Sequence, residues 1–158
     1  MTHGGKENGG GMEPRLSDFI GTWQLSRRIV EADGRCATFT GTACFTPDAE
    51  GLSYREEGLL SLPGAPAPIR AERSYLWREE GRDIVVLFGD GRPFHRFAPA
   101  RPEAAHWCDP DDYRVHYDFS RWPVWRAEWR VRGPRKDYRM SGEYGRAPGA
   151  ALAKPVLL

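Results

Sequence analysis

The sequence lacks a run of charge of one sign and lacks a long apolar segment. Its 158 residues carry 23 lysines and arginines against 22 aspartates and glutamates, which gives a formal net charge of +1. Without a basic cluster, a role in binding nucleic acid or a charged membrane surface has no electrostatic basis. The apolar stretches are far shorter than the roughly 20 residues that a membrane-spanning helix requires. We therefore expect no nucleic-acid partner and no membrane partner.

The N-terminal segment lacks the basic-then-apolar pattern of a secretory signal peptide. Residues 1–14 are rich in glycine and polar side chains and predict a disordered extension, and the Ala- and Pro-rich residues 147–158 predict a loose tail. The remaining residues, 15–146, show no internal repeat and no domain boundary. They are numerous enough to bury a core without disulfides or metals, so we expect one domain.

Cysteine is scarce and odd in number, with Cys36, Cys44 and Cys108. Cys36 and Cys44 lie in one predicted strand, roughly 27 Å apart at about 3.4 Å per residue, so they cannot pair with each other. We expect reduced thiols and a cytoplasmic protein. The sequence leaves open whether the chain is a monomer or a homodimer.

Helical patterns are nearly absent, and the segment Arg15–Ile20 predicts only one helical turn that closes the end of a barrel. From Gly21 onward, apolar and polar residues alternate with period two between turns rich in Gly, Pro and Asp, which is typical of β-strands. The predicted strands are Gly21–Glu31, Arg35–Thr46, Leu52–Leu60, Arg70–Glu79, Arg82–Phe88, Pro93–Ala98, Ala104–Cys108, Asp112–Phe119, Val124–Arg132 and Lys136–Tyr144. Strands of about this number joined by tight turns predict a single antiparallel up-and-down β-barrel of about 8–10 strands, since closure removes both sheet edges.

Alternate residues of each strand in a small barrel face its lumen, and the apolar phase predicts which ones. That phase includes Trp23 and Leu25, then Phe39 and Phe45, and leaves Thr38, Thr40 and Thr42 outside. On later strands it includes Leu52, Tyr54, Tyr75, Trp77, Tyr113, Val115, Tyr117, Trp125, Ala127, Trp129, Tyr138, Met140 and Tyr144. The phase of Phe94–Phe97 is ambiguous, although His95 with Phe97 is its more apolar choice.

Three charged side chains share the inward phase: Arg27, Glu56 and Arg73. An unpaired charge in a dry interior costs several kcal/mol, so these groups must pair, be hydrated or hold a ligand. Two alternatives remain open. Glu56 neutralises Arg27 or Arg73 in a buried bridge that involves no ligand, or a register slip of one residue turns all three outward.

A short helical turn followed by Gly21-Thr22-Trp23 resembles the Gly-x-Trp opening of lipocalins and related calycin barrels. Together with Asp90-Gly-Arg-Pro-Phe-His95, His106-Trp-Cys108 and Gly133-Pro-Arg-Lys-Asp-Tyr138, it resembles a family of uncharacterised bacterial lipocalin-like domains, over most of residues 17–146. The resemblance implies a calycin barrel in which Trp23 packs at the closed end beneath Arg139 or Arg146. It implies no established activity.

The chain departs from neighbouring families. It shows neither the signal peptide nor the disulfide of secreted lipocalins, and a tight turn replaces the helix pair of fatty-acid-binding proteins. The Arg-Arg-Tyr carboxylate site of those proteins is nevertheless an analogy for Arg27, Arg73 and a lumen tyrosine. The C-terminal histidine of haem-binding barrels has no counterpart here, so haem binding is not expected.

The leading functional prediction is a small organic ligand in the lumen, with arginine holding its carboxylate or phenolate. Tryptophans would enclose an apolar or aromatic body, and tyrosines would add hydroxyl groups. The predicted ligand-binding residues are Trp23, Arg27, Tyr54, Glu56, Arg73, Tyr75, Trp77, Tyr113, Trp125, Trp129 and Tyr138.

The alternative is a cofactor-free isomerase, cyclase, dehydratase or decarboxylase in the same lumen. His95 and His106 would perform acid–base chemistry, oriented by Glu56 or Asp90, and Tyr113 or Tyr117 would donate to a developing oxyanion. A structural role for each histidine is the competing interpretation. No nucleophile elbow, phosphate-binding loop or dinucleotide fingerprint is present, so no cofactor is expected.

Two polar motifs remain. His106, Cys108, Asp109 and Asp111 match no standard zinc spacing and are better explained as a strand that ends in a turn, so we expect no metal. The loop Gly133–Asp137 either guides an anion inward through its basic side chains, Arg135 and Lys136, or is a simple solvated turn.

Overall fold

The computed structural model describes residues 13–146, and the predictions for residues 1–12 and 147–158 lie outside the described part. The single predicted helical turn is a 3₁₀ turn, η1 (Leu16–Phe19). The strands are β1 (Gly21–Glu31), β2 (Cys36–Pro47), β3 (Leu52–Ser61), β4 (Ile69–Glu80), β5 (Asp83–Phe88), β6 (Pro93–Phe97), β7 (Glu103–Cys108), β8 (Asp111–Arg121), β9 (Val124–Arg132) and β10 (Asp137–Arg146). Every predicted strand is present, with boundaries that differ by at most two residues.

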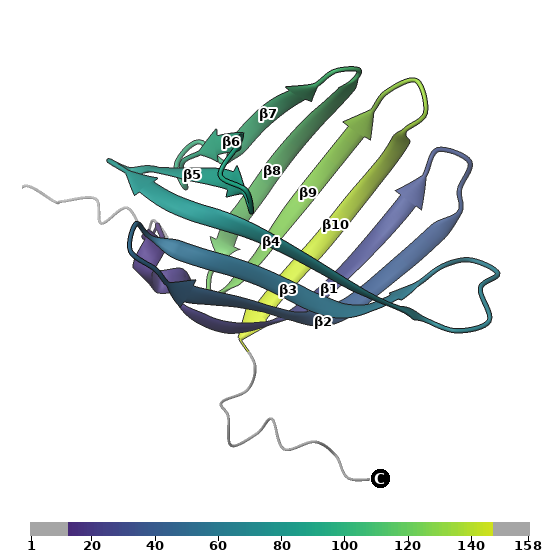
Figure 1. Ribbon diagram of the computed structural model, residues 1–158, viewed down its shortest axis with the longest axis horizontal. Helices are drawn as coiled ribbons and strands as arrows, with labels where there is room; N and C mark the ends of the chain where they lie inside the picture. Colours follow the sequence, from purple (N-terminus) through teal and green to yellow (C-terminus); the bar gives the residue numbers. More distant parts are fainter. Residues whose placement is uncertain (1–12, 147–158) are drawn as a thin grey trace, which may run out of the picture.

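The strands form one antiparallel meander that curls into a barrel (Figure 1). Each strand from β1 to β6 and from β7 to β10 lies beside the next in the chain, and β1 also pairs with β10, so the sheet order is β6-β5-β4-β3-β2-β1-β10-β9-β8-β7. The two edge strands, β6 and β7, meet at a seam where the described residues form only an isolated bridge between Ala98 and Arg101. The predicted up-and-down barrel is confirmed, and its closure is near-complete.

One end of the barrel is sealed by η1 and the last residue of β10. Phe19 and Trp23 are fully buried, and the Trp23 indole N–H donates to the Phe19 carbonyl at 2.9 Å. The Arg146 guanidinium lies 3.7 Å from the centroid of the Trp23 ring and donates to the carbonyls of Asp18 (2.7 Å) and Ile20 (3.0 Å). The stacked and charge-assisted contacts tie the last strand to the first turn. The expected pairing of Trp23 with a last-strand arginine is therefore confirmed.

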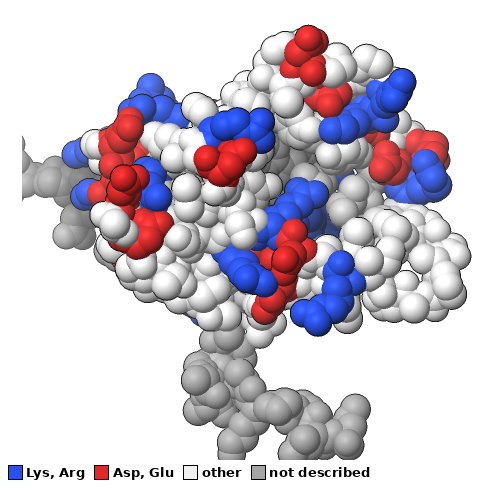
Figure 2. Space-filling model, viewed as in Figure 1, with Lys and Arg blue, Asp and Glu red and all other residues white. Residues whose placement is uncertain are grey.

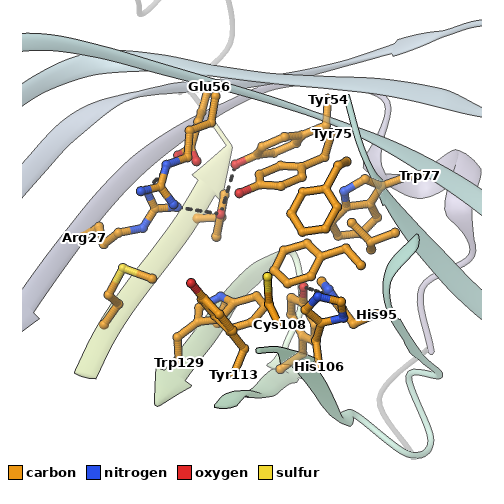
Figure 3. A pocket seen from close by; sticks show the side chains of 18 of the residues that line it. Arg27, Tyr54, Glu56, Tyr75, Trp77, His95, His106, Cys108, Tyr113 and Trp129 are labelled. Carbon is orange, nitrogen blue, oxygen red and sulfur yellow. Dashed lines mark hydrogen bonds and ion pairs between the residues drawn. The ribbon is translucent and has the colours of Figure 1, made fainter. Parts of the chain in front are cut away.

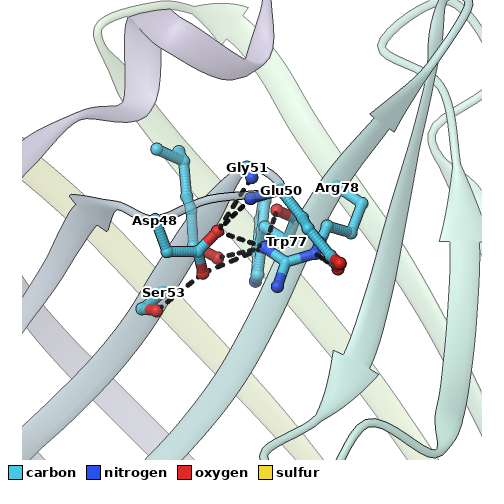
Figure 4. A network of polar contacts seen from close by, with 7 residues as sticks. Asp48, Glu50, Gly51, Ser53, Trp77 and Arg78 are labelled. Carbon is cyan, nitrogen blue, oxygen red and sulfur yellow. Dashed lines mark hydrogen bonds and ion pairs between the residues drawn. The ribbon is translucent and has the colours of Figure 1, made fainter.

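A polar network holds the turn between β2 and β3 (Figure 4). The Asp48 carboxylate accepts from the backbone N–H groups of Glu50 (3.0 Å) and Gly51 (2.8 Å), and from the Ser53 hydroxyl (2.8 Å). It also accepts from the Arg78 guanidinium at 2.9 Å. This turn is thereby anchored to β4.

The inward phase predicted from alternation agrees with the observed burial. His95 and Phe97 are buried, which resolves the ambiguous phase of β6, while Thr38 and Thr40 are exposed. The side chains of Arg27 and Glu56 are 12% and 3% exposed. The register-slip alternative is therefore wrong for this pair.

The surface and the thiols fit the expectations from composition. On the face shown in Figure 2, acidic and basic side chains are interspersed. Cys36, Cys44 and Cys108 are all free. In residues 13–146, no helix has the length and apolar character needed to cross a membrane. The cytoplasmic location stays a prediction.

Candidate functional site

The lumen contains a cavity of about 420 Å³. All predicted site residues except Trp23 line it, and Trp23 instead packs in the sealed end beneath Arg146. The lining extends to Arg92 and Lys136, which lie in the turns at the opposite end of the barrel. The base of the cavity lies at the end of the barrel that η1 closes. Its other end lies at the β5–β6 and β9–β10 turns, and we call this end the mouth.

Near-parallel aromatic rings form one wall of the cavity. Phe88 stacks on Phe94 with centroids 4.5 Å apart and planes at 15°, and Phe94 stacks on Trp129 at 5.3 Å and 17°. His106 packs edge-on against Phe94, with centroids 5.3 Å apart. This part of the cavity lining is therefore apolar and aromatic.

Sequence reasoning missed Phe88 and Phe94 as site residues. Strict alternation assigns Phe94 and His95 to opposite faces, yet both line the cavity. The cause is a register shift between Val86 and Leu87, where Val86 pairs with His95 and Leu87 pairs with Pro93. Phe94 is the extra residue of this bulge. The sequence signal that could have identified Phe88 and Phe94 is their position on either side of a Gly-rich hairpin turn.

Arg27 and Glu56 form a buried ionic cluster that also lines the cavity (Figure 3). Nη1 of Arg27 is 2.9 Å from Oε2 of Glu56, and Nη2 donates to the Tyr144 hydroxyl at 3.4 Å. The hydroxyl groups of Tyr144 and Tyr54 are 3.1 Å apart. Burial opposes the charge of Arg27, but Tyr144, Glu56 and Tyr54 outweigh it and raise the Arg27 pKa. The alternative in which Glu56 neutralises Arg27 is therefore the one observed.

His95 and Tyr117 form a second polar pair on the cavity wall. Nε2 of His95 is 2.8 Å from the Tyr117 hydroxyl. Burial, with a smaller contribution from nearby His106, lowers the pKa of His95 to about 3. Burial also raises the Tyr117 pKa well above its usual value. Both groups are consequently neutral near pH 7.

The mouth carries basic side chains with different degrees of neutralisation. Lys136 lies 3.0 Å from the Asp111 carboxylate and donates to the Tyr113 hydroxyl at 3.0 Å. Arg92 is paired with Asp90 at 2.7 Å. Arg73 is exposed, and residues 13–146 supply no acidic partner within ion-pair distance of it. Arg73 is therefore the cavity-lining cation left available to a ligand in the described structure.

Arg73 also acts on a neighbouring tyrosine. Burial raises the pKa of Tyr138, and the positive charges of Lys136 and Arg73 partly offset that rise. Within residues 13–146, His106, Cys108, Asp109 and Asp111 do not gather into a group that could hold a metal ion.

Comparison with known proteins places this barrel in a family. The model described as "Family of unknown function (DUF6314)" matches residues 19–146. The chain belongs to the DUF6314 family. The resemblance to an uncharacterised barrel family is thereby confirmed at the level of a family of unknown function, while its bacterial distribution stays untested. No curated protein matches this DUF6314 chain.

Solved structures similar to the DUF6314 chain include the S-type phycobiliprotein lyase CPES from Guillardia theta. The two have 11% sequence identity and a TM-score of 0.53, over 82% of this chain and 87% of that one. A de novo designed fluorescence-activating β-barrel has 18% identity and a TM-score of 0.40, over 86% of this chain and 100% of that one. At these identities the similarity to the lyase shows a common barrel fold and nothing further.

Proposed function

We propose that the lumen binds a small, flat, largely apolar molecule that carries an anionic group. The observation that carries this proposal is Arg73, a cation at the mouth of an aromatic cavity without an acidic partner among residues 13–146. A carboxylate or phenolate would accept charge-assisted hydrogen bonds from its guanidinium. The stacked wall of Phe88, Phe94 and Trp129 would bury the apolar body.

The anion is assigned to Arg73 and not to Arg27, although sequence reasoning named both. Arg27 already has the Glu56 carboxylate at 2.9 Å and the Tyr144 hydroxyl at 3.4 Å. A second carboxylate at Arg27 would meet the negative charge of Glu56 in a buried setting, which is unfavourable. In this proposal the Arg27–Glu56 pair stabilises the wall of the cavity.

The test compares an anionic aromatic probe, 2-naphthoate, with its neutral isostere, 2-naphthamide, by isothermal titration calorimetry. We expect the wild-type protein to bind 2-naphthoate about 3- to 10-fold more tightly, the modest gain that a solvent-exposed charge contact provides. Arg73→Gln should remove this preference. Arg70→Gln is the matched control, because Arg70 lies on the same strand, is exposed and occupies the opposite phase.

Equal binding of the two probes by the wild-type protein would contradict the anion site. A complete lack of binding would contradict the proposed function itself. An effect of Arg70→Gln as large as that of Arg73→Gln would show that only the overall charge matters.

A second candidate is acid–base catalysis on the bound molecule, favoured by the 2.8 Å contact of His95 with Tyr117 at the cavity wall. The low His95 pKa, about 3, weighs against it, because an efficient general base has a pKa near the working pH. Catalysis would convert a bound aromatic carboxylate into a different compound over time, whereas binding alone leaves it intact. Chromatography with mass spectrometry of the recovered ligand separates the two candidates.

A further inference from the structure

A second, smaller cavity adjoins the main one. It has a volume of about 70 Å³ and is lined by residues of β1, β2, β3, β4 and β10. Four side chains line both cavities, namely Arg27, Glu56, Arg73 and Met140. Because the two spaces share these side chains, the smaller one lies directly beside the main cavity, and we call it the side pocket. At roughly 30 Å³ for a water-sized group, it has room for about two or three carbon atoms.

Apolar side chains provide most of the surface of the side pocket. Its uncharged lining residues are Ile29, Phe39, Leu60, Ala71 and Met140. Ile29, Leu60 and Ala71 are each partly exposed, so they retain surface that a ligand can cover. The main cavity is instead lined mainly by aromatic rings. The two spaces therefore suit different groups, an aromatic body in the main cavity and an aliphatic group in the side pocket.

The charged residues of the side pocket are already paired, with the exception of Arg73. The Glu56 carboxylate is 2.9 Å from Arg27 (Figure 3), and the Glu72 carboxylate is 2.7 Å from Arg55. Residues 13–146 supply no acidic partner within ion-pair distance of Arg73. An aliphatic group that leaves water for this pocket needs no charged partner, so the pocket favours an uncharged apolar group.

We infer that the ligand is a branched amphipathic acid, with its anionic group at Arg73, an aromatic body in the main cavity and a short aliphatic branch in the side pocket. This inference rests on the proposed function and specifies its ligand class. Arg73 is the point of branching because its exposed side chain lines both cavities. A ligand anchored there can place one apolar group on each side of the guanidinium, and the burial of both groups adds affinity and fixes the orientation.

The experiment compares 2-naphthylacetate with racemic 2-(2-naphthyl)pentanoate by isothermal titration calorimetry. The second acid carries an additional propyl group on the carbon atom beside the carboxylate, a branch of the size that the side pocket admits. We expect the wild-type protein to bind this branched acid about 10-fold more tightly. The gain stays below the roughly 50-fold that full burial of three carbon groups would give, because Leu60 and Ala71 are partly exposed.

Two variants of neighbouring leucines test the assignment to the side pocket. Leu60→Asn places a polar amide in the side pocket and should abolish the preference for the branched acid. Leu59→Asn is the matched control and should retain the preference, because Leu59 is 49% exposed on the opposite face of the strand and lines neither cavity. An equal loss of the preference in both variants would overturn the side pocket, since it would indicate general attraction to an apolar surface.

The outcomes separate this inference from the proposed function. If neither acid binds to the wild-type protein, the proposed function fails and the inference fails with it. If both acids bind equally, the side pocket is overturned while the anionic aromatic site stands. Equal weakening of both acids by Leu60→Asn, with the preference unchanged, would likewise overturn the side pocket, since it would indicate a purely structural role.

A second measurement keeps the inference testable if Leu60→Asn does not fold. In wild-type protein with ¹³C-labelled alanine methyl groups, nuclear Overhauser contacts should join the propyl group of bound 2-(2-naphthyl)pentanoate to Ala71, which lines the side pocket and not the main cavity. Contacts to Ala127, which lines the main cavity and not the side pocket, in place of Ala71 would overturn the inference.

Discussion

At the scale of single residues, the neighbours of each polar group in the lumen determine whether that group is charged or neutral. Arg27 keeps its charge because Glu56 and the tyrosines Tyr54 and Tyr144 surround it. His95 loses its charge because burial lowers its pKa and the nearby His106 lowers it further. The same interior therefore holds an ionised pair and a neutral histidine, each set by its immediate partners.

The low His95 pKa predicts a pH-dependent stability. The unfolded chain binds a proton at His95 near the ordinary pKa of 6.5, whereas the folded protein does so only near about 3. Acidification within this window therefore favours the unfolded state, and stability is lost as pH falls below 6.5. Between about pH 7 and pH 5 we expect His95 to account for a loss of about 2 kcal/mol in the free energy of unfolding.

Urea unfolding of the wild-type protein, His95→Phe and His116→Phe over this pH range measures the effect. Between about pH 7 and pH 5, the free energy of unfolding of His95→Phe should fall by about 2 kcal/mol less than that of the wild-type protein. His116→Phe, which replaces an exposed histidine, is the control variant. His95→Phe also leaves the Tyr117 hydroxyl without its partner. That cost is the same at every pH, so it does not change the slope of the free energy of unfolding against pH. A wild-type slope that survives His95→Phe would show that His95 does not titrate as the structure implies.

At the scale of elements, β2 and β3 approach each other closely at two opposed glycines. Gly41 pairs with Gly58, and a Cβ on Gly41 would lie 2.7 Å from the Gly58 Cα and would also collide with the Glu57 carbonyl. A Cβ on Gly58 would lie 2.8 Å from the Phe39 ring, whose side chain covers this position. Glycine at such sites permits a tight bend of a barrel wall.

We predict that Gly41→Ala destabilises the protein by about 1–3 kcal/mol, the usual cost of overpacking against a backbone that cannot withdraw. Gly145→Ala is the matched control, because Gly145 also lies in a strand and its Cβ would meet nothing within 4 Å. Its effect should stay within about 0.5 kcal/mol. Thermal or urea unfolding provides the comparison, and equal stability of the two variants would refute the close-approach argument.

At the scale of the whole molecule, hydrogen bonding between strands is uneven around the circumference of the barrel. β1, β2 and β10 each pair with a strand on both sides, whereas β6 pairs only with β5 and β7 only with β8. The seam between β6 and β7 carries the cavity-lining side chains of Phe94, His95 and His106. The least hydrogen-bonded part of the described barrel therefore borders the candidate site.

Hydrogen exchange should reveal this asymmetry. We expect amides of β6 and β7 to exchange faster than those of β1, β2 and β10, because local opening at an edge breaks fewer backbone hydrogen bonds. Exchange followed by mass spectrometry at peptide resolution measures the difference. Uniform protection around the barrel would contradict it and would indicate a single cooperative unit.

The sequence by itself determined the strands, their order and most of the lumen-facing residues. Period-two alternation and turn chemistry act locally, so they specify which face each side chain occupies and where each strand ends. That is why Trp125, Tyr117 and Glu56 were correctly placed inside, and why the strand ends agree within two residues.

Only the tertiary structure decided how the inward groups combine. Arg27 meets Tyr144 across 117 positions of sequence, and His95 meets Tyr117 across 22. Alternation gives the face of a residue but neither its depth in the lumen nor its partner across it, because both depend on the stagger and curvature of the closed sheet. The stagger and curvature of the sheet determine that Arg27 is paired with Glu56, that Trp23 seals the base beneath Arg146, and that Arg73 has no acidic partner among residues 13–146.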